Sequence, residues 1–194
     1  MSISEDGLRK NQANFASLSP LSFLERTRKT FPNQTAIEYK DYKLSYKQAG
    51  QRCEALANLI KNQNFNSGTT IAVMLPNIPV MWECHFGVPM ATGVLNAINT
   101  RLDSHTVQFI LEHGEAKLFI YDSEYSPIVE KAIVNLKNPP TIIEFVDEVA
   151  GNKRSNFANK VNCLDYETEL KNFIGTTFEH VLPNDEWNSI ALNY

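Results

Sequence analysis

The sequence predicts an α/β fold: a doubly wound, mostly parallel sheet with flanking helices and a small N-terminal hairpin. Four short apolar runs have the length and β-branched content of buried strands. Segments of helical length separate these runs. A strand, a helix and a second strand in succession form a right-handed crossover, which makes the sheet parallel. The four predicted strands are residues 71–75, 94–99, 116–122 and 141–146.

The N-terminal part is predicted to hold a tail and an amphipathic helix. Residues 1–17 are polar and are expected to be loosely held. Ser19 is expected to cap a helix over residues 21–31, with Pro20 at its first position. Pro32 then ends this helix.

Residues 35–46 alternate between apolar and polar side chains, which predicts two short strands that turn at Lys40 and Asp41. Ser45, with Gln48 three residues later, has the pattern of a capping box. The helix that follows is expected to bury one apolar stripe. That stripe consists of Ala49, Cys53, Leu56, Ala57 and Ile60.

Residues 70–102 contain the first two predicted core strands and the helix that connects them. Pro76 ends the run 71–75, and residues 79–91 then carry apolar side chains almost all round, which predicts a buried helix. Trp82 on this helix is therefore expected to be a core residue. Gly93 is expected to end the helix before the second strand.

The later segments repeat this alternation. Asp103 or Ser104 caps a helix that Gly114 closes, and Ser126 before Pro127 starts another. The final segments are less regular and are interpreted by composition. They are a polar surface excursion over residues 147–160, a short helix over residues 164–174, a turn near Pro183 and Asn184, and a strand over residues 190–194.

Composition narrows the function classes. The chain has 194 residues, 43% hydrophobic and 21% charged, with a net charge of -4, which disfavours a nucleic-acid-binding surface. No apolar run approaches the roughly 20 residues of a membrane span, and the start lacks a signal-peptide core. We therefore expect a cytoplasmic protein. Three widely spaced cysteines, Cys53, Cys84 and Cys163, are expected to be reduced core thiols.

Several local patterns suggest chemistry but have plainer structural explanations. Residues 166–169, Tyr-Glu-Thr-Glu, are interpreted as a solvated helix start. Cys84 and His85 are neighbours on a helix, so their side chains diverge and cannot pair. Gly87 and Gly93 lack the Lys-Ser/Thr of a phosphate-binding loop, so we interpret them as packing and capping positions.

Three further polar residues, two histidines and an arginine, are candidate ligands. His105 and His113 bracket a predicted helix, and His113 with Glu112 has the residue types of metal ligands, but one-turn spacing and a third ligand are lacking, so a metal site is not predicted. His113 is instead favoured by the helix dipole. Arg101 follows a parallel strand, where α/β folds bind ligands, yet an ion pair with a loop carboxylate is the preferred interpretation.

Three stretches together resemble the AMP-forming acyl-CoA synthetases, the adenylate-forming ligases. Residues 44–60 resemble an early helix motif of that family, residues 73–102 its second core motif, and residues 185–194 the strand that leads into its phosphate loop. The resemblance extends over nearly the whole chain from Leu18. It implies that residues 18–194 are the N-terminal portion of the AMP-binding domain, incomplete and ending before the phosphate loop.

The resemblance implies a two-step reaction. A fatty or other carboxylic acid attacks ATP to form an acyl-adenylate, and CoA then displaces AMP to give a thioester. ATP, Mg²⁺ and CoA are the implied cofactors of the full-length parent, and a small carboxylic acid is its substrate. The family's phosphate loop, ribose-binding Asp and catalytic Lys are expected beyond Tyr194. The sequence therefore offers no catalytic, cofactor-binding or metal-ligating residue, and the chain alone is expected to be inactive.

Two alternatives remain open. The chain is a complete, non-catalytic interaction module whose last strand pairs with a partner chain, or it is an unrelated nucleotide-binding α/β protein. The missing phosphate-binding glycines count against the latter. For the incomplete domain we expect the apolar faces of residues 71–75 and 190–192 to lie open, and the chain to self-associate.

Overall fold

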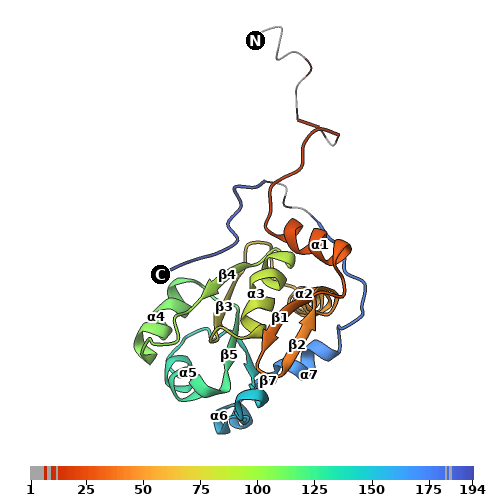
Figure 1. The fold of residues 1–194 in the computed structure, drawn as a ribbon. Coiled ribbons are helices and arrows are strands. Elements are labelled where there is room, and N and C mark those ends of the chain that lie inside the picture. The colour runs from red at the N-terminus through yellow and green to blue at the C-terminus, as the bar shows by residue number, and fades with distance from the viewer. Residues whose placement is uncertain (1–6, 8–9, 12, 182, 184) are drawn as a thin grey trace.

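Five parallel strands form the central sheet, in the order β4-β3-β5-β6-β7 (Figure 1). The computed structural model describes residues 7, 10–11, 13–181, 183 and 185–194. The strands are β3 (Thr70–Met74), β4 (Val94–Ala97), β5 (Leu118–Asp122), β6 (Thr141–Phe145) and β7 (Leu164–Asp165). The four predicted strands are confirmed. The two-residue β7 is too short to show a periodicity in the sequence.

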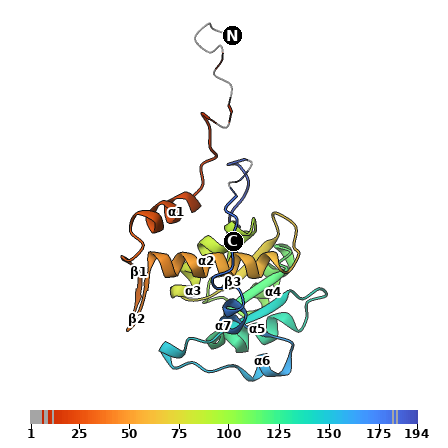
Figure 2. The same cartoon turned by 90° about the vertical axis from the view of Figure 1, so that its right-hand side faces the viewer.

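Helices cover both faces of this sheet (Figure 2). One face packs against α2 (Tyr46–Lys61), α3 (Pro79–Met90) and α7 (Tyr166–Lys171). The opposite face packs against α4 (Ser104–His113), α5 (Ser126–Ile133) and α6 (Asn156–Lys160). The predicted doubly wound architecture is therefore confirmed.

The central strand β3 is buried on both faces. Ile71 and Val73 belong to the core on one side, Ala72 and Met74 to the core on the other, and all four are fully buried. The expectation that the apolar faces of residues 71–75 lie open is therefore wrong. Helices supplied by this chain already cover both sides of the strand.

The N-terminal elements form an additional layer on α2 and α3. Leu24 of α1 (Leu21–Thr30) packs against Cys53, Ala57 and Met90. The hairpin consists of the antiparallel strands β1 (Thr35–Tyr39) and β2 (Tyr42–Ser45). Pro20 occupies the cap of α1 and not its first turn, while the hydroxyl of Ser19 accepts the Leu21 N–H at 3.3 Å.

The predicted helix caps explain where several helices begin. Ser45 and Gln48 form the predicted capping box of α2. Asp103 caps α4 by accepting the backbone N–H groups of His105 and Thr106. The predicted end of α3 differs, because Thr92 takes the left-handed conformation (φ +61°). A Cβ at Gly93 would lie 3.1 Å from Val88, so this glycine permits close packing.

The C-terminal third differs most from expectation. The polar excursion contains the 3₁₀ turn η3 (Glu148–Ala150) and α6, whose Phe157 is only 7% exposed, so it is not wholly a surface segment. The last predicted strand is reduced to one parallel bridge between Ala191 and Leu95 of β4. Ile190 beside it is 43% exposed. Of the predicted turn, Asn184 lies outside the described residues, as does most of the predicted tail.

Among the helices of the described residues, none combines the length and apolar character needed to cross a membrane.

Candidate functional site

A cavity of about 430 Å³ lies between the β1–β2 hairpin, the start of α3 and the carboxyl ends of β6 and β7. This is the edge at which parallel α/β sheets bind ligands. The cavity lining combines aromatic rings with groups of both charges. It includes Tyr39, Tyr42, Arg52, Phe145, Asp147, Glu167 and Lys171.

Tyr39 and Asp147 join the hairpin to the sheet at this cavity. The Tyr39 hydroxyl donates to Asp147 Oδ2 at 2.7 Å, and Asp147 Oδ1 accepts the Ala150 N–H at 3.0 Å. The hydrogen bond to Asp147 is the main reason that the pKa of Tyr39 rises to about 12. Tyr39 therefore stays protonated at neutral pH and serves as a hydrogen-bond donor, not as a base.

Arg52 of α2 connects three helices on the same side of the cavity. Its Nε donates to Glu83 Oε1 of α3 at 2.5 Å, and its Nη2 donates to Glu167 Oε1 of α7, also at 2.5 Å. The Tyr166 hydroxyl donates to Glu83 Oε2 at 2.8 Å. Glu83 is fully buried, so Arg52 and Tyr166 supply the hydrogen bonds that its carboxylate loses from water.

Electrostatics of this cluster follow from its burial. Burial raises the pKa of Glu83, and the charge and hydrogen bonds of Arg52 oppose that rise. Burial lowers the pKa of Arg52, but hydrogen bonds to Glu167 and Glu83 more than reverse this effect. The arginine therefore remains charged. We assign the cluster a structural role, because its groups are already satisfied by one another.

Asp122 ends β5 and is 1% exposed. Its Oδ1 accepts the Glu124 N–H and the Asn152 amide, while Oδ2 has no hydrogen-bond partner among the described residues. Burial raises the pKa of this carboxyl group, and the charge of Asp147 raises it further. The carboxyl edge of the sheet therefore carries two buried acidic groups.

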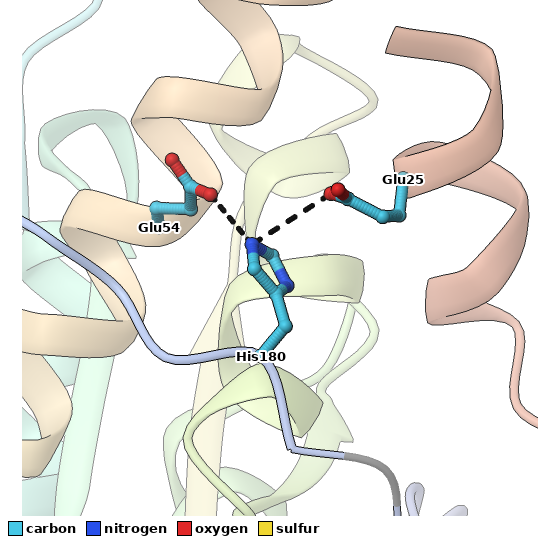
Figure 3. A group of neighbouring side chains, drawn as sticks. All are labelled: Glu25, Glu54 and His180. Atoms are coloured by element: carbon cyan, nitrogen blue, oxygen red, sulfur yellow. Dashed lines mark hydrogen bonds and ion pairs between the residues drawn. The ribbon is translucent and has the colours of Figure 1, made fainter. Parts of the chain in front are cut away.

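A second charged cluster joins α1, α2 and the segment before the C-terminus (Figure 3). His180 Nε2 lies 2.6 Å from Glu54 Oε1 and 3.6 Å from Glu25 Oε2. These three side chains have the types and spacing of a metal site.

Arg28 already occupies the position that a cation would take in this cluster. Its Nη2 lies 2.6 Å from Glu54 Oε1 and 3.0 Å from His180 Nε2, and its Nε lies 2.5 Å from Glu25 Oε2. Lys29 also pairs with Glu25 at 2.9 Å. Two cations balance two carboxylates, so the cluster is an ion-pair network and does not fit a metal ion.

The other residues that the sequence offers as candidates for chemistry do not form a common site in the structure. Cys84 is fully buried while His85 is exposed, as predicted. Trp82 packs against Phe86 at a centroid distance of 4.6 Å, within the cluster beneath α1. His113, in the last turn of α4, lies 2.7 Å from the Tyr194 hydroxyl, and His105 lies at the other end of that helix.

Two interpretations of local patterns are wrong. Arg101 is exposed and forms no ion pair with any residue that the structure describes; its backbone N–H donates to Asn99. The start of α7 is not a solvated segment, because Tyr166 is fully buried and Glu167 binds Arg52. The acidic composition of this segment suggested exposure to solvent, but Glu167 pairs with Arg52 on another helix.

The sequence analysis did not identify the acidic groups at the carboxyl edge of the sheet, of which Asp147 lines the cavity. Asp122 is the last residue of β5 and Asp147 follows β6, and an acidic residue at the carboxyl end of a buried strand is a signal that the sequence does contain. The pairing of Arg52 with Glu83 had no such signal. It depends on how α2 lies against α3, which helical periodicity does not specify.

Comparisons with known proteins agree with this architecture. The family model described as AMP-binding enzyme matches residues 24–192. An acetate–CoA ligase of Humulus lupulus is 35% identical, with 97% of this chain and 34% of that protein covered. A trans-cinnamate:CoA ligase of Petunia hybrida, named as peroxisomal, is 34% identical, with 97% of this chain and 35% of that protein covered.

Solved structures show the same fold. A crystal structure of the anthranilate CoA ligase AuaEII in complex with anthranoyl-AMP matches with a TM-score of 0.78 at 18% identity, with 95% of this chain and 33% of that chain covered. This chain spans about a third of the length of the curated relatives it matches. It belongs to the AMP-binding enzyme family, whose matched members include CoA ligases.

Proposed function

We propose that the protein carrying this chain is an ATP-dependent, AMP-forming ligase that converts a small carboxylic acid to its CoA thioester. The observation that supports this proposal most is the family match over residues 24–192 together with 35% identity to an acetate–CoA ligase. Acetate, butyrate and cinnamate appear in the names of relatives, so a short-chain or aromatic acid is as well supported as a fatty acid.

Within this proposal, residues 18–194 are the N-terminal portion of the acyl-adenylate-forming domain. ATP, Mg²⁺ and CoA are then cofactors of the whole protein. The residues described here do not fit the phosphates of ATP, because the buried carboxylates of Asp122 and Asp147 occupy the carboxyl edge of the sheet. We therefore assign this portion the role of scaffold. We assign the groups that bind phosphate and metal to the remainder of the protein.

A cytoplasmic location is part of the proposal. The names of three relatives place those proteins in peroxisomes, which makes the peroxisome the alternative to test.

The alternative of a non-catalytic module is less well supported by the geometry. It required the last strand to pair with a partner chain. Instead, the Leu95 N–H donates to the Ile190 carbonyl at 3.0 Å and the Leu192 N–H donates to the Leu95 carbonyl at 2.9 Å, so this strand pairs with β4 of its own chain.

Two assays test the proposed function. The protein that carries this chain, incubated with ATP, Mg²⁺, CoA and either acetate, butyrate or cinnamate, should release AMP and form the acyl-CoA. Residues 1–194 alone should give no carboxylate-dependent exchange of pyrophosphate into ATP. Absence of AMP release with every acid would contradict the assignment, and exchange by the isolated chain would contradict its role as scaffold.

A further inference from the structure

A second cavity, of about 560 Å³, lies between one face of α1 and the segment 178–181. The α1 residues that line it recur once per helical turn, so a whole face of the helix forms one wall. They are Leu21, Ser22, Glu25, Arg26, Lys29 and Thr30. Phe178, His180 and Val181 form the opposite wall, and Met90 at the end of α3 completes the lining.

One part of this groove is apolar. Leu21, Met90 and Phe178 belong to a single apolar cluster with Leu24 of α1. Val181 extends this surface toward solvent, because its side chain is 60% exposed. Apolar surface that is open to water favours burial against an alkyl chain.

The α1 wall adds an excess of positive charge. Glu25 is compensated by Arg28 and Lys29, at 2.5 and 2.9 Å. Arg26, which is exposed and also lines the groove, forms no ion pair with any residue that the structure describes. His180 is held by Glu54 at 2.6 Å, so the acidic groups beside the groove already have partners. Among the described cations that line the groove, Arg26 is the one without an ion pair.

We propose that this groove binds a free single-chain amphiphile with one anionic head group, such as a medium-chain alkyl carboxylate or sulfonate. The alkyl chain lies against Leu21, Met90, Phe178 and Val181, and the head group pairs with Arg26. A polyphosphate would leave the apolar wall uncovered, and a neutral alkane would leave Arg26 unpaired. The site lies apart from the cavity at the carboxyl edge of the sheet, because the two cavities share no lining residue.

Calorimetric titration of the protein with octane-1-sulfonate tests the proposal, since a sulfonate head group cannot form an acyl-adenylate. We expect saturable binding of one molecule. Butane-1-sulfonate, with four fewer methylenes, should bind at least about tenfold more weakly. Octan-1-ol, which keeps the chain and loses the charge, should bind about threefold more weakly or worse. Failure to bind octane-1-sulfonate, or equal affinity for all three compounds, would overturn the proposal.

Charge-matched variants locate the site. Arg26→Glu should weaken binding of octane-1-sulfonate about three- to tenfold, because an exposed ion pair becomes a repulsion. Lys137→Glu makes the same change of charge at an exposed lysine outside the groove and should leave affinity unchanged. Equal effects of the two variants would mean that the anion responds only to net charge, which would overturn the assignment of Arg26.

A second pair of variants tests the apolar wall. Val181→Asp should reduce affinity at least about tenfold, whereas Val134→Asp, at a valine that is 74% exposed outside the groove, should have no effect. Both valines are exposed, so thermal unfolding should stay within a few degrees of the parent protein. Retained binding in Val181→Asp would overturn the placement of the alkyl chain.

Sedimentation with phosphatidylglycerol vesicles separates a free ligand from a membrane surface. We expect no cosedimentation at physiological ionic strength, because binding is assigned to single molecules in the groove. Cosedimentation that Arg26→Glu abolishes, without binding of free octane-1-sulfonate, would overturn the proposal in favour of a membrane surface.

Discussion

Two clusters in this protein place an arginine between two glutamates from different elements, and they differ in depth. In the buried cluster, Arg52 is 12% exposed and pairs with the fully buried Glu83 as well as with Glu167. In the peripheral cluster, Arg28 is 20% exposed and pairs with Glu25 and Glu54, beside His180. Both clusters connect elements that are distant in the sequence.

The difference shows that burial, more than the number of ion pairs, decides how strongly a cluster constrains the fold. Loss of water raises the pKa of Glu83 in the buried cluster. In the peripheral cluster burial also raises the pKa of Glu25, but hydrogen bonds from Lys29 and Arg28 lower it overall. Removing a partner should therefore cost far more in the first cluster, where water cannot replace it.

The largest expected effect is that of Arg52→Ala. This change leaves Glu83 buried without its cation and should reduce the free energy of unfolding by about 3–5 kcal/mol. Urea unfolding followed by circular dichroism measures the loss. Arg101→Ala, at an exposed arginine without an ion pair among the described residues, is the matched control and should change it by less than about 0.5 kcal/mol. Similar losses in the two variants would mean that Arg52 is not the counterion of a buried charge.

Tyr166→Phe sharpens the comparison by removing one hydrogen bond from the buried cluster. The Glu83 carboxylate loses a donor at 2.8 Å, so the free energy of unfolding should fall by about 1–3 kcal/mol. Tyr42→Phe is the control, since the Tyr42 hydroxyl has no hydrogen-bond partner among the described residues. An unchanged midpoint in Tyr166→Phe would show that Arg52 alone satisfies Glu83.

Arg28→Ala removes the arginine of the peripheral cluster, just as Arg52→Ala removes the arginine of the buried cluster. Water can reach Glu25 and Glu54, so the expected loss of unfolding free energy is only about 1 kcal/mol. Lys29→Ala, at a lysine whose side chain is 74% exposed, should cost still less. A loss from Arg28→Ala as large as that from Arg52→Ala would contradict the view that burial sets the difference.

The smallest expected effect concerns pH. The pKa of Glu25 is lower in the folded protein than its ordinary value of 4.5, so its contribution to stability is present above pH 4.5 and lost as pH falls through the folded pKa. Glu25→Gln should therefore be less stable than the parent by about 0.5 kcal/mol at pH 7, with the gap closing as the pH falls below 4.5 through the folded pKa. Urea unfolding at pH 7 and at a series of pH values below 4.5 measures this gap.

Glu83 is expected to contribute to stability with the opposite pH dependence. Its pKa is raised by burial, so its contribution is present at low pH and is lost as pH rises above 4.5 through the folded pKa. Glu83→Gln should reduce the pH dependence above pH 4.5. If both variants changed the same pH range, the two carboxyl groups would not differ in the way that their burial implies.

The sequence by itself determined the elements and their class. The runs at residues 71–75 and 141–146 fix strands because continuous apolar, β-branched stretches must be buried on both faces. Ser45 and Asp103 mark helix starts because their side chains can accept backbone N–H groups only a few residues ahead. These interactions are local, so the order of residues is enough to predict them.

Tertiary structure alone decided which distant groups meet. Arg52 and Glu167 are separated by 115 residues, and Arg28 and His180 by 152, so no periodicity relates them. Burial of Tyr166 was hidden for the same reason, since an acidic helix start has the same composition whether it faces water or another helix. The periodicity of apolar residues in the sequence indicates which side chains are buried. The partner of a charged side chain depends instead on how the helices pack against one another.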